Sequence, residues 1–158
     1  MFIYSINGKK LKKIALCTVL IIGVVLCYTF INKSDPYTLE SGNIPVNIKI
    51  SSDSDVKSFL EQYGWQVSDN PTEISTIRIP SVFNDVYASY NTLQLSQGFD
   101  LSKFMGETCK KYTYSVLNYP DKSENINATV IVYGDKVIAG DIADSSFKGF
   151  MQGLNRTS

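Results

Sequence analysis

Three aspartates in the C-terminal part of the chain, Asp100, Asp141 and Asp144, are the residues best suited to chemistry. Two carboxyl groups that a fold brings together can act as general acid and general base, or can hold a hard cation through their oxygens. The sequence therefore leaves open a carboxylate-based hydrolase or a cation-binding domain that uses Asp100 with Asp141 or Asp144. Sequence spacing alone does not show that these side chains meet.

Most other reaction chemistries lack the residues that they require. The chain contains no histidine, which is the commonest general base and the commonest zinc ligand in proteins. It has no Gly-x-Ser-x-Gly nucleophile motif and no phosphate-binding P-loop, and Cys109 has no histidine to activate its thiol. We therefore assign no catalytic residue, expect no cofactor and no metal site outside the alternative above, and favour a binding role over an enzyme.

Polar side chains within the aromatic-rich part of the chain are candidates for contacts with a ligand or partner. These candidates are Gln94, Gln97, Asp100, Tyr112 and Asp141. Each also has a structural interpretation, because side chains of this kind cap helical turns and accept hydrogen bonds at strand ends. A small domain that is rich in tyrosine and lacks a catalytic cluster favours recognition of a protein or a small ligand.

The uncharged run at residues 14–31 predicts a single membrane-spanning helix. Its eighteen residues would extend roughly 27 Å as a helix, close to the ~30 Å thickness of the bilayer hydrocarbon. A cleaved signal peptide is less consistent with this length and with the absence of small residues at its end. A lipid-modified cysteine is also disfavoured, because Leu26 precedes Cys27 where a small residue is expected. We therefore predict an uncleaved anchor in the lipid bilayer.

The charges around this run predict its orientation. Four lysines stand immediately before it, at positions 9, 10, 12 and 13, whereas only Lys33 stands close after it. Because positive charge is retained inside, the N-terminus is expected in the cytoplasm and the rest of the chain outside, at the cell membrane. The predicted parts are a cytoplasmic stub (1–13), the span (14–31), a linker (32–43) and an extracytoplasmic domain (44–158).

The outer part of the chain is mildly acidic. After residue 31 it carries 11 basic and 15 acidic residues, a net charge of −4, without a basic run. This charge disfavours nucleic acid as a partner, and no nucleic-acid contact is expected. The partners that remain are the bilayer and an unidentified protein or small ligand outside the cell.

Hydrophobic periodicity predicts an α+β domain with a mainly antiparallel sheet and about two helices packed against it. Ser52 and Asp55 resemble a capping box at the start of the first helix, and Gly64 is expected to end it. A second helix is expected to start at Ser81 and to bury a stripe of apolar and aromatic residues in the core. The stripe consists of Val82, Phe83, Val86, Tyr87, Tyr90 and Leu93. Strands are expected at 44–50, 65–67, 73–79, 107–119, 126–133 and 136–142.

The last two predicted strands form a hairpin. Gly134-Asp135 is a two-residue loop of the kind that closes antiparallel hairpins. A regular ladder from this loop predicts three cross-strand pairs: Val132 with Val137, Ile131 with Ile138, and Val130 with Ala139. The segment after residue 142 is expected to add no more than a turn or a frayed helix.

Several motifs resemble those of the bacterial domain-of-unknown-function family 4830. They include Ile79-Pro80-Ser81-Val82-Phe83, Tyr90-Asn91-Thr92-Leu93-Gln94, Gln97-Gly98-Phe99-Asp100-Leu101, Tyr112-Thr113-Tyr114, Gly140-Asp141 and Gly149-Phe150-Met151. The resemblance covers about residues 48–154. It implies a protein of Gram-positive bacteria, often with one N-terminal membrane segment and with no assigned activity. No functional residue is carried over from the family.

Overall fold

The computed structural model describes residues 18–19, 21–25, 37–41, 44–120, 125–146 and 149–156. The chain divides into two compact units, Met1–Asp35 and Pro36–Ser158. In the first unit, residues 18–19 and 21–25 are helical, and the rest of the predicted span at 14–31 lies outside the described residues. None of the helices in the described ranges is long and apolar enough to cross a membrane.

The second unit is an α+β domain, as its periodicity predicts. Its main sheet is an antiparallel meander in which each strand pairs with the next one along the chain. The five strands are β3 (Glu73–Arg78), β4 (Thr108–Ser115), β5 (Ile126–Tyr133), β6 (Lys136–Asp144) and β7 (Met151–Gln152). A separate antiparallel pair contains β1 (Thr38–Ser41) and β2 (Ile44–Asn47). The helices are α2 (Asp53–Gln62), α3 (Asp85–Leu95) and the short 3-10 helix η1 (Leu101–Phe104).

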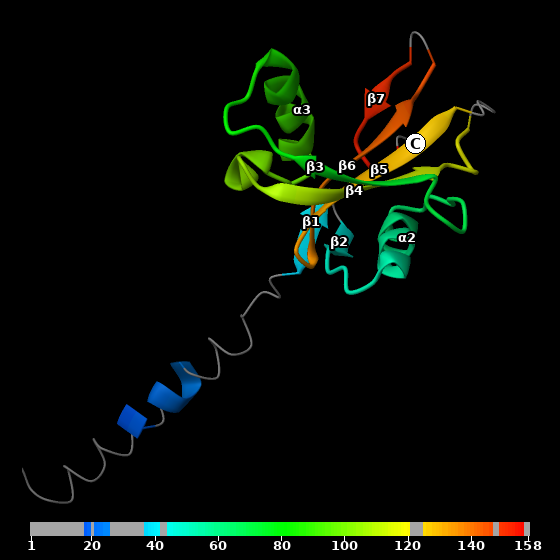
Figure 1. Ribbon diagram of the computed structural model, residues 1–158. Coiled ribbons are helices and arrows are strands. Elements are labelled where there is room, and N and C mark those ends of the chain that lie inside the picture. Colours follow the sequence, from blue (N-terminus) through cyan, green and yellow to red (C-terminus); the bar gives the residue numbers. More distant parts are fainter. Residues whose placement is uncertain are drawn as a thin grey trace, which may run out of the picture. The chain divides into compact units, whose positions relative to one another are not determined.

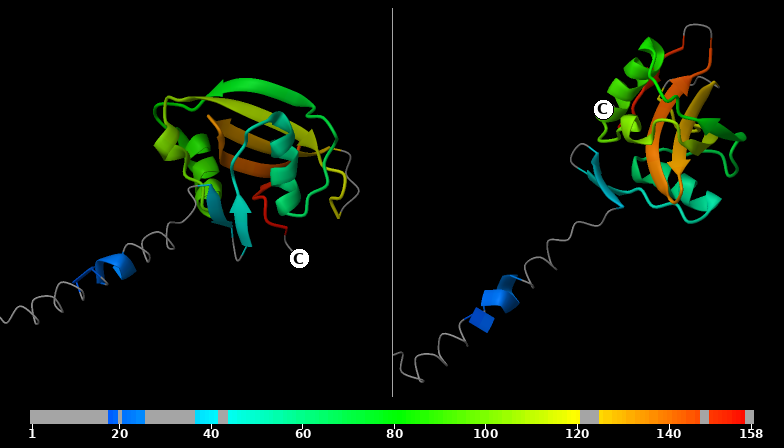
Figure 2. Two further views of the ribbon diagram at one scale, coloured as in Figure 1. Left: turned by 90° about the horizontal axis from the view of Figure 1, so that it is seen from below. Right: turned by 60° about the vertical axis from the view of Figure 1, so that its left-hand side comes forward.

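Helices cover both faces of the main sheet. Figure 1 shows α2 and the β1–β2 pair on one side of the sheet and α3 on the other. The view from below in Figure 2 shows α2 and the β1–β2 pair lying over the same face. Because side chains alternate between the faces of a strand, the sheet contributes to two separate cores.

The larger core lies on the α2 side. Asp55 accepts hydrogen bonds from the backbone N–H groups of Ser51 and Ser52, at 2.7 and 2.8 Å, and so supports the helix start that the capping pattern predicts. The chain leaves α2 through Gly64, whose φ of 80° is costly for other residues. The buried cluster contains Val56, Phe59 and Leu60 of α2, together with Val46, Ile48, Trp65, Tyr112, Tyr114, Val130 and Ile142.

The smaller core lies on the opposite face. Its fully buried members are Ile79, Leu101, Cys109, Ile131, Ile138 and Ala139, and Phe83, Tyr90 and Phe104 pack against them. Both cores are built from residues of the second unit alone. A unit that has its own hydrophobic core is expected to fold without the rest of the chain, so Pro36–Ser158 should fold without residues 1–35.

The predicted hairpin register is correct only next to the turn. Val132 pairs with Val137 as expected, but Ile131 pairs with Ala139 rather than with Ile138. The ladder is irregular between Ile131 and Val132, so Ile138 is an additional residue on β6. A bulge of this kind shifts every later pair by one residue, and an extra residue cannot be recognised from alternation alone.

The expected burial of the α3 stripe is wrong at its N-terminal end. Val82 and Val86 are 80% and 73% exposed, respectively. The helix starts later than Ser81, because Asn84 is the N-cap and its side chain accepts a hydrogen bond from the Tyr87 N–H at 2.9 Å. The buried residues of α3 are instead two polar ones, Asn91 and Gln94.

Two further segments differ from the expected elements. Strand β1 lies within the stretch predicted as a linker, where it pairs with β2. The expected strand at 65–67 is reduced to a single bridge between Val67 and Val116. Short segments such as these acquire strand structure from their neighbours, and their own sequences carry little signal.

Residues 151–156 join elements on both faces of the sheet, and we call them the C-terminal clasp. After β7, Leu154 is fully buried, and its carbonyl accepts a hydrogen bond from the Trp65 indole N–H at 2.6 Å. Arg156 donates to the Gly64 carbonyl at 3.0 Å and lies 5.0 Å above the centre of the Trp65 ring. The clasp is therefore part of the core and not the frayed end that its length suggests.

Candidate functional site

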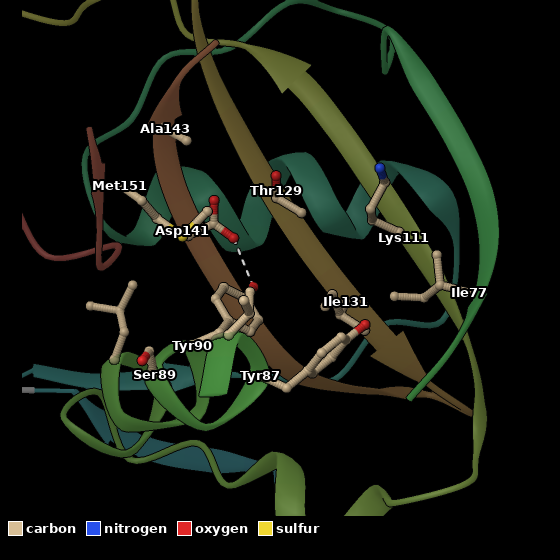
Figure 3. Close-up of a pocket in the computed structure, with 12 residues that line it drawn as sticks. Ile77, Tyr87, Ser89, Tyr90, Lys111, Thr129, Ile131, Asp141, Ala143 and Met151 are labelled. Atoms are coloured by element: carbon tan, nitrogen blue, oxygen red, sulfur yellow. Dashed lines mark hydrogen bonds between the residues drawn. The ribbon is translucent and has the colours of Figure 1, made fainter. Parts of the chain in front are cut away.

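A cavity of about 700 Å³ lies between α3 and the main sheet, and we call it the α3 cavity (Figure 3). From α3 it is lined by Val86, Tyr87, Ser89, Tyr90 and Leu93. From the strands it is lined by Ile77, Lys111, Thr129, Ile131, Asp141, Ala143 and Met151. Most of these side chains are apolar or aromatic. Val86 and Met151 are largely exposed to solvent, so the cavity is accessible from outside.

Strand alternation places the polar side chains of the cavity. Thr129 on β5 and Asp141 on β6 are directly opposite each other in the ladder, so their side chains emerge on the same face. Lys111 of β4 pairs with Ile131, which also lines the cavity. In α3, Val86, Tyr90 and Leu93 recur at helical spacing and face this side of the sheet. Residues of the stripe expected to fill the core thus line the α3 cavity.

Asp141 is the only acidic or basic residue that is fully buried among the described residues, with 2% of its surface exposed. The Tyr90 hydroxyl donates to its Oδ1 at 2.8 Å, shown as the dashed line in Figure 3. Burial raises the pKa of Asp141 to about 6, against the opposing effects of the Tyr90 hydrogen bond, the charge of Lys111 and the Thr129 hydroxyl. The same burial, together with the charge of Asp141, raises the pKa of Tyr90 well above its ordinary value.

The charge of Lys111 is already matched on the strand beside it. Its ammonium lies 3.5 Å from the Glu73 carboxylate, and both side chains are partly exposed. In the register, Lys111 pairs with Ser75 of β3, so this ion pair runs across two neighbouring strands. Among the described residues, Asp141 is thus the buried acid of the α3 cavity, and none of them forms a direct salt bridge with it.

The α3 cavity combines apolar walls with a buried carboxyl group. The cavity offers a large apolar surface and one buried carboxyl group, which is the usual composition of a ligand site. Asp141 is the only carboxyl group among the described residues that line it. Acid–base chemistry by a pair of carboxyl groups would require a second one within reach of the same substrate.

Gln94 and Gln97, two of the predicted site residues, are buried and bind backbone. Gln97 donates to the Gly140 carbonyl at 3.0 Å and accepts from the Leu154 N–H at 2.6 Å. Gln94 accepts from the Gly140 N–H at 3.0 Å. Strand β7 pairs with β6 only at Ile142 and Ala143, and the two amides bind the backbone of Gly140 just beyond that pairing. Their observed role is therefore structural.

Asp100 and Asp144 are also occupied by local hydrogen bonds. Asp100 accepts from the backbone N–H and the hydroxyl of Ser102 at the start of η1, at 3.1 and 2.6 Å. Asp144 accepts from the Ser146 N–H at 2.9 Å, and neither aspartate lines the α3 cavity. The structure therefore does not bring Asp100 or Asp144 together with Asp141 in this cavity. Within the described ranges, no group of three or more acidic, cysteine or histidine side chains is placed to hold a metal ion.

Tyr112 points to the opposite face of the sheet. Its hydroxyl donates to Asp53 at the start of α2, at 2.6 Å, and its side chain is buried in the larger core. Burial and the neighbouring Asp53 carboxylate raise the pKa of Tyr112. Of the five predicted site residues, only Asp141 lines the α3 cavity.

Tyr90, Lys111 and Thr129 line the cavity but are absent from the sequence-based candidates. Thr129 could have been selected from its position opposite Asp141 in the ladder. The β6 bulge prevents this prediction, because it changes the register. A regular ladder from the turn places Thr129 opposite Gly140, whereas the observed pairing places it opposite Asp141. The signal for Tyr90 is weaker, because an aromatic residue at helical spacing usually belongs to a core.

Comparison with known proteins places part of the chain in a protein family. A family model described as a domain of unknown function (DUF4830) matches residues 59–142, which is more than half of the chain. This range runs from α2 to β6 and includes the residues of α3 and the sheet that position Asp141. No curated protein and no solved structure matches the chain.

Proposed function

The chain belongs to the family described as a domain of unknown function (DUF4830), and we propose that its second unit binds a small, largely apolar molecule in the α3 cavity. The observation that carries this proposal is the cavity itself. Its volume of about 700 Å³ lies within the usual range for ligand sites, roughly 300–1,000 Å³.

The exposed apolar residues at the cavity support this function. Val86 is 73% exposed and Met151 is 54% exposed, although both are hydrophobic and line the same cavity as Leu93 and Ile131. Covering such surface with an apolar ligand is favourable by about 25 cal/mol per Å². A ligand seated here would therefore complete the core that α3 leaves open. A hydrolase built on Asp100 or Asp144 receives no comparable support, because both are bound in local turns.

Filling the cavity from within should abolish binding. We expect the isolated unit 36–158 to bind the uncharged dye N-phenyl-1-naphthylamine saturably, with increased fluorescence as the dye leaves water. In Ala143→Phe the new ring enters the cavity, and we expect the dye affinity to fall at least about tenfold, the effect of losing roughly 1.4 kcal/mol of apolar contact. Circular dichroism should show a cooperative unfolding transition in both proteins.

The matched control is Ala88→Phe. Ala88 is exposed on α3 and does not line the cavity, so the same substitution there should leave the dye affinity within about twofold. A native unit that shows no saturable binding, or an Ala143→Phe variant that binds as well as Ala88→Phe, would contradict the proposed site.

We also propose that residues 14–31 anchor this domain in the cell membrane, with the domain outside. The length of the uncharged run and the four lysines before it support this location. We expect the full chain to remain in carbonate-washed membranes and a protease added outside intact cells or spheroplasts to degrade the domain. The chain without residues 1–31 is the control and should appear in the soluble fraction. Release of the full chain by carbonate would refute the anchor.

A further inference from the structure

We propose that the α3 cavity selects molecules that carry an ammonium group on an apolar body, and that Asp141 binds the ammonium. This inference rests on the proposed ligand-binding function and names the chemical class of the ligand. It follows from the position of Asp141, the one fully buried acid in the described part of the chain, from the charges around it and from the apolar walls on either side.

The carboxylate of Asp141 has hydrogen-bonding capacity that the protein does not use fully. An ionised carboxylate can accept about four hydrogen bonds through its two oxygens. Tyr90 donates to Oδ1 at 2.8 Å, and the Thr129 hydroxyl lies beside the carboxylate from the opposite strand. In Figure 3 the second oxygen of Asp141 points away from Tyr90, toward the part of the cavity near Ala143. An ammonium group, which has three donors, would complete this set.

The charges around Asp141 leave a net negative site. From β4, Lys111 faces Asp141, but its charge is matched by Glu73 of β3 at 3.5 Å. From α3, the facing groups are the hydroxyl-bearing Tyr90 and Tyr87, and from β7 it is Met151, which has no charge. Among the described residues, the charges of Lys111, Glu73 and Asp141 therefore sum to −1 when Asp141 is ionised. A cation complements this site, whereas an anion would meet a buried acid of the same sign.

The buried acid is also unfavourable for the empty protein. Removing a carboxylate from water without a cationic partner costs free energy, and the raised pKa of Asp141, about 6, reflects this cost. A ligand ammonium would supply a cationic partner to a carboxylate that is itself 2% exposed. The apolar body of the ligand would lie against Val86, Leu93 and Ile131, which line the same cavity.

Two probes of the same size separate this inference from the proposed function. Phenethylamine and 2-phenylethanol have the same apolar body and differ in the ammonium group. We expect calorimetric or NMR titration of unit 36–158 at pH 8 to give about tenfold tighter binding of the amine, consistent with a charge-assisted hydrogen bond. The anion 3-phenylpropionate should bind more weakly than the alcohol. The preference for the amine should shrink at pH 5, where Asp141 is protonated.

Asp141→Asn tests the role of the carboxylate. This variant should lose the preference for the amine over the alcohol, to less than about twofold. Asp144→Asn is the matched control, because Asp144 lies on the same strand outside the cavity, and it should retain the native preference.

The outcomes distinguish the two proposals. Equal binding of amine and alcohol by the native unit would overturn ammonium selection and leave apolar ligand binding in place. A preference that survives in Asp141→Asn would overturn the role of Asp141. If neither probe nor the dye binds, both ammonium selection and the proposed function are overturned.

Discussion

Replacing Asp141 by asparagine should stabilise the domain at pH 8, although the substitution removes a hydrogen-bonded residue. The pKa of the buried carboxyl is about 6 in the folded protein, against an ordinary value of 3.8. At pH 8, ionisation of Asp141 therefore lowers the free energy of unfolding by roughly 3 kcal/mol. Asparagine keeps an oxygen that can accept from Tyr90 and carries no charge to desolvate.

The sign of the pH dependence follows from proton binding. Between about pH 4 and pH 6 the folded protein holds a proton on Asp141 that the unfolded chain has already released. Ionisation of Asp141 therefore does not destabilise the folded protein below about pH 4. The free energy of unfolding decreases as the pH rises through this window, and the loss is complete above about pH 7. Asp141→Asn lacks this contribution, so the two proteins should differ little at pH 3.5 and most at pH 8.

Urea denaturation of unit 36–158 at several pH values between 3.5 and 8 would measure this effect. The informative quantity is the difference in the free energy of unfolding between Asp141→Asn and the native unit, which should grow by roughly 3 kcal/mol across the series. Asp144→Asn provides the control for removing a carboxyl group from the same strand outside the cavity. An Asp141→Asn variant that is less stable than the native unit at pH 8 would contradict the assignment of Asp141 as a costly buried acid.

Replacing Gln97 by methionine should destabilise the domain by roughly 3 kcal/mol, even though methionine has a similar length and shape. The Gln97 amide binds the Gly140 carbonyl and the Leu154 N–H, at 3.0 and 2.6 Å, in the interior of the protein. Methionine leaves both backbone groups without this partner, and each buried group left unsatisfied costs about 1–3 kcal/mol. The expected loss of stability therefore arises from two backbone groups, the Gly140 carbonyl and the Leu154 N–H, that lose the same partner.

Thermal and urea unfolding of unit 36–158 would measure this loss. Gln66→Met is the matched control, because Gln66 is exposed, and it should change stability by less than about 0.5 kcal/mol. Gln97→Glu adds a second comparison, since a carboxylate can accept from Leu154 but cannot donate to Gly140. It should also be destabilised. A Gln97→Met variant as stable as Gln66→Met would show that the amide contributes shape alone.

The parts of the fold that local sequence specifies could be predicted. The first helix is an example, because its cap at Ser52, its apolar positions and its stop at Gly64 lie within a few residues of one another. The antiparallel hairpin was predictable for the same reason near its turn. The register beyond Ile131 was not, because one extra residue at a bulge leaves the pattern of apolar residues almost unchanged.

The site was predictable only in part, for a different reason. Asp141 could be selected as a polar residue in an apolar strand, but its partner Tyr90 is 51 residues away in the sequence. Gln94 and Gln97 look like surface residues of a helix, and they are buried because the backbone of Gly140 needs partners where β7 ends. These hydrogen bonds join residues far apart in the sequence. They depend on the topology and cannot be predicted from the sequence around the helix.

The C-terminal clasp is synthesised after the elements against which it packs, so it affects when the domain can finish folding. Trp65 and Leu154 are hydrogen-bonded across 89 residues of sequence, and Leu154 completes the core beneath α2. At about 5–20 residues per second, a ribosome needs roughly 4–18 s to add the residues between them. During that interval α2 and the first strands lack a side chain on which their packing depends. We therefore expect the packing of this core to be complete only after the clasp has been made, which in the proposed anchored protein would be late in the passage of the domain across the membrane.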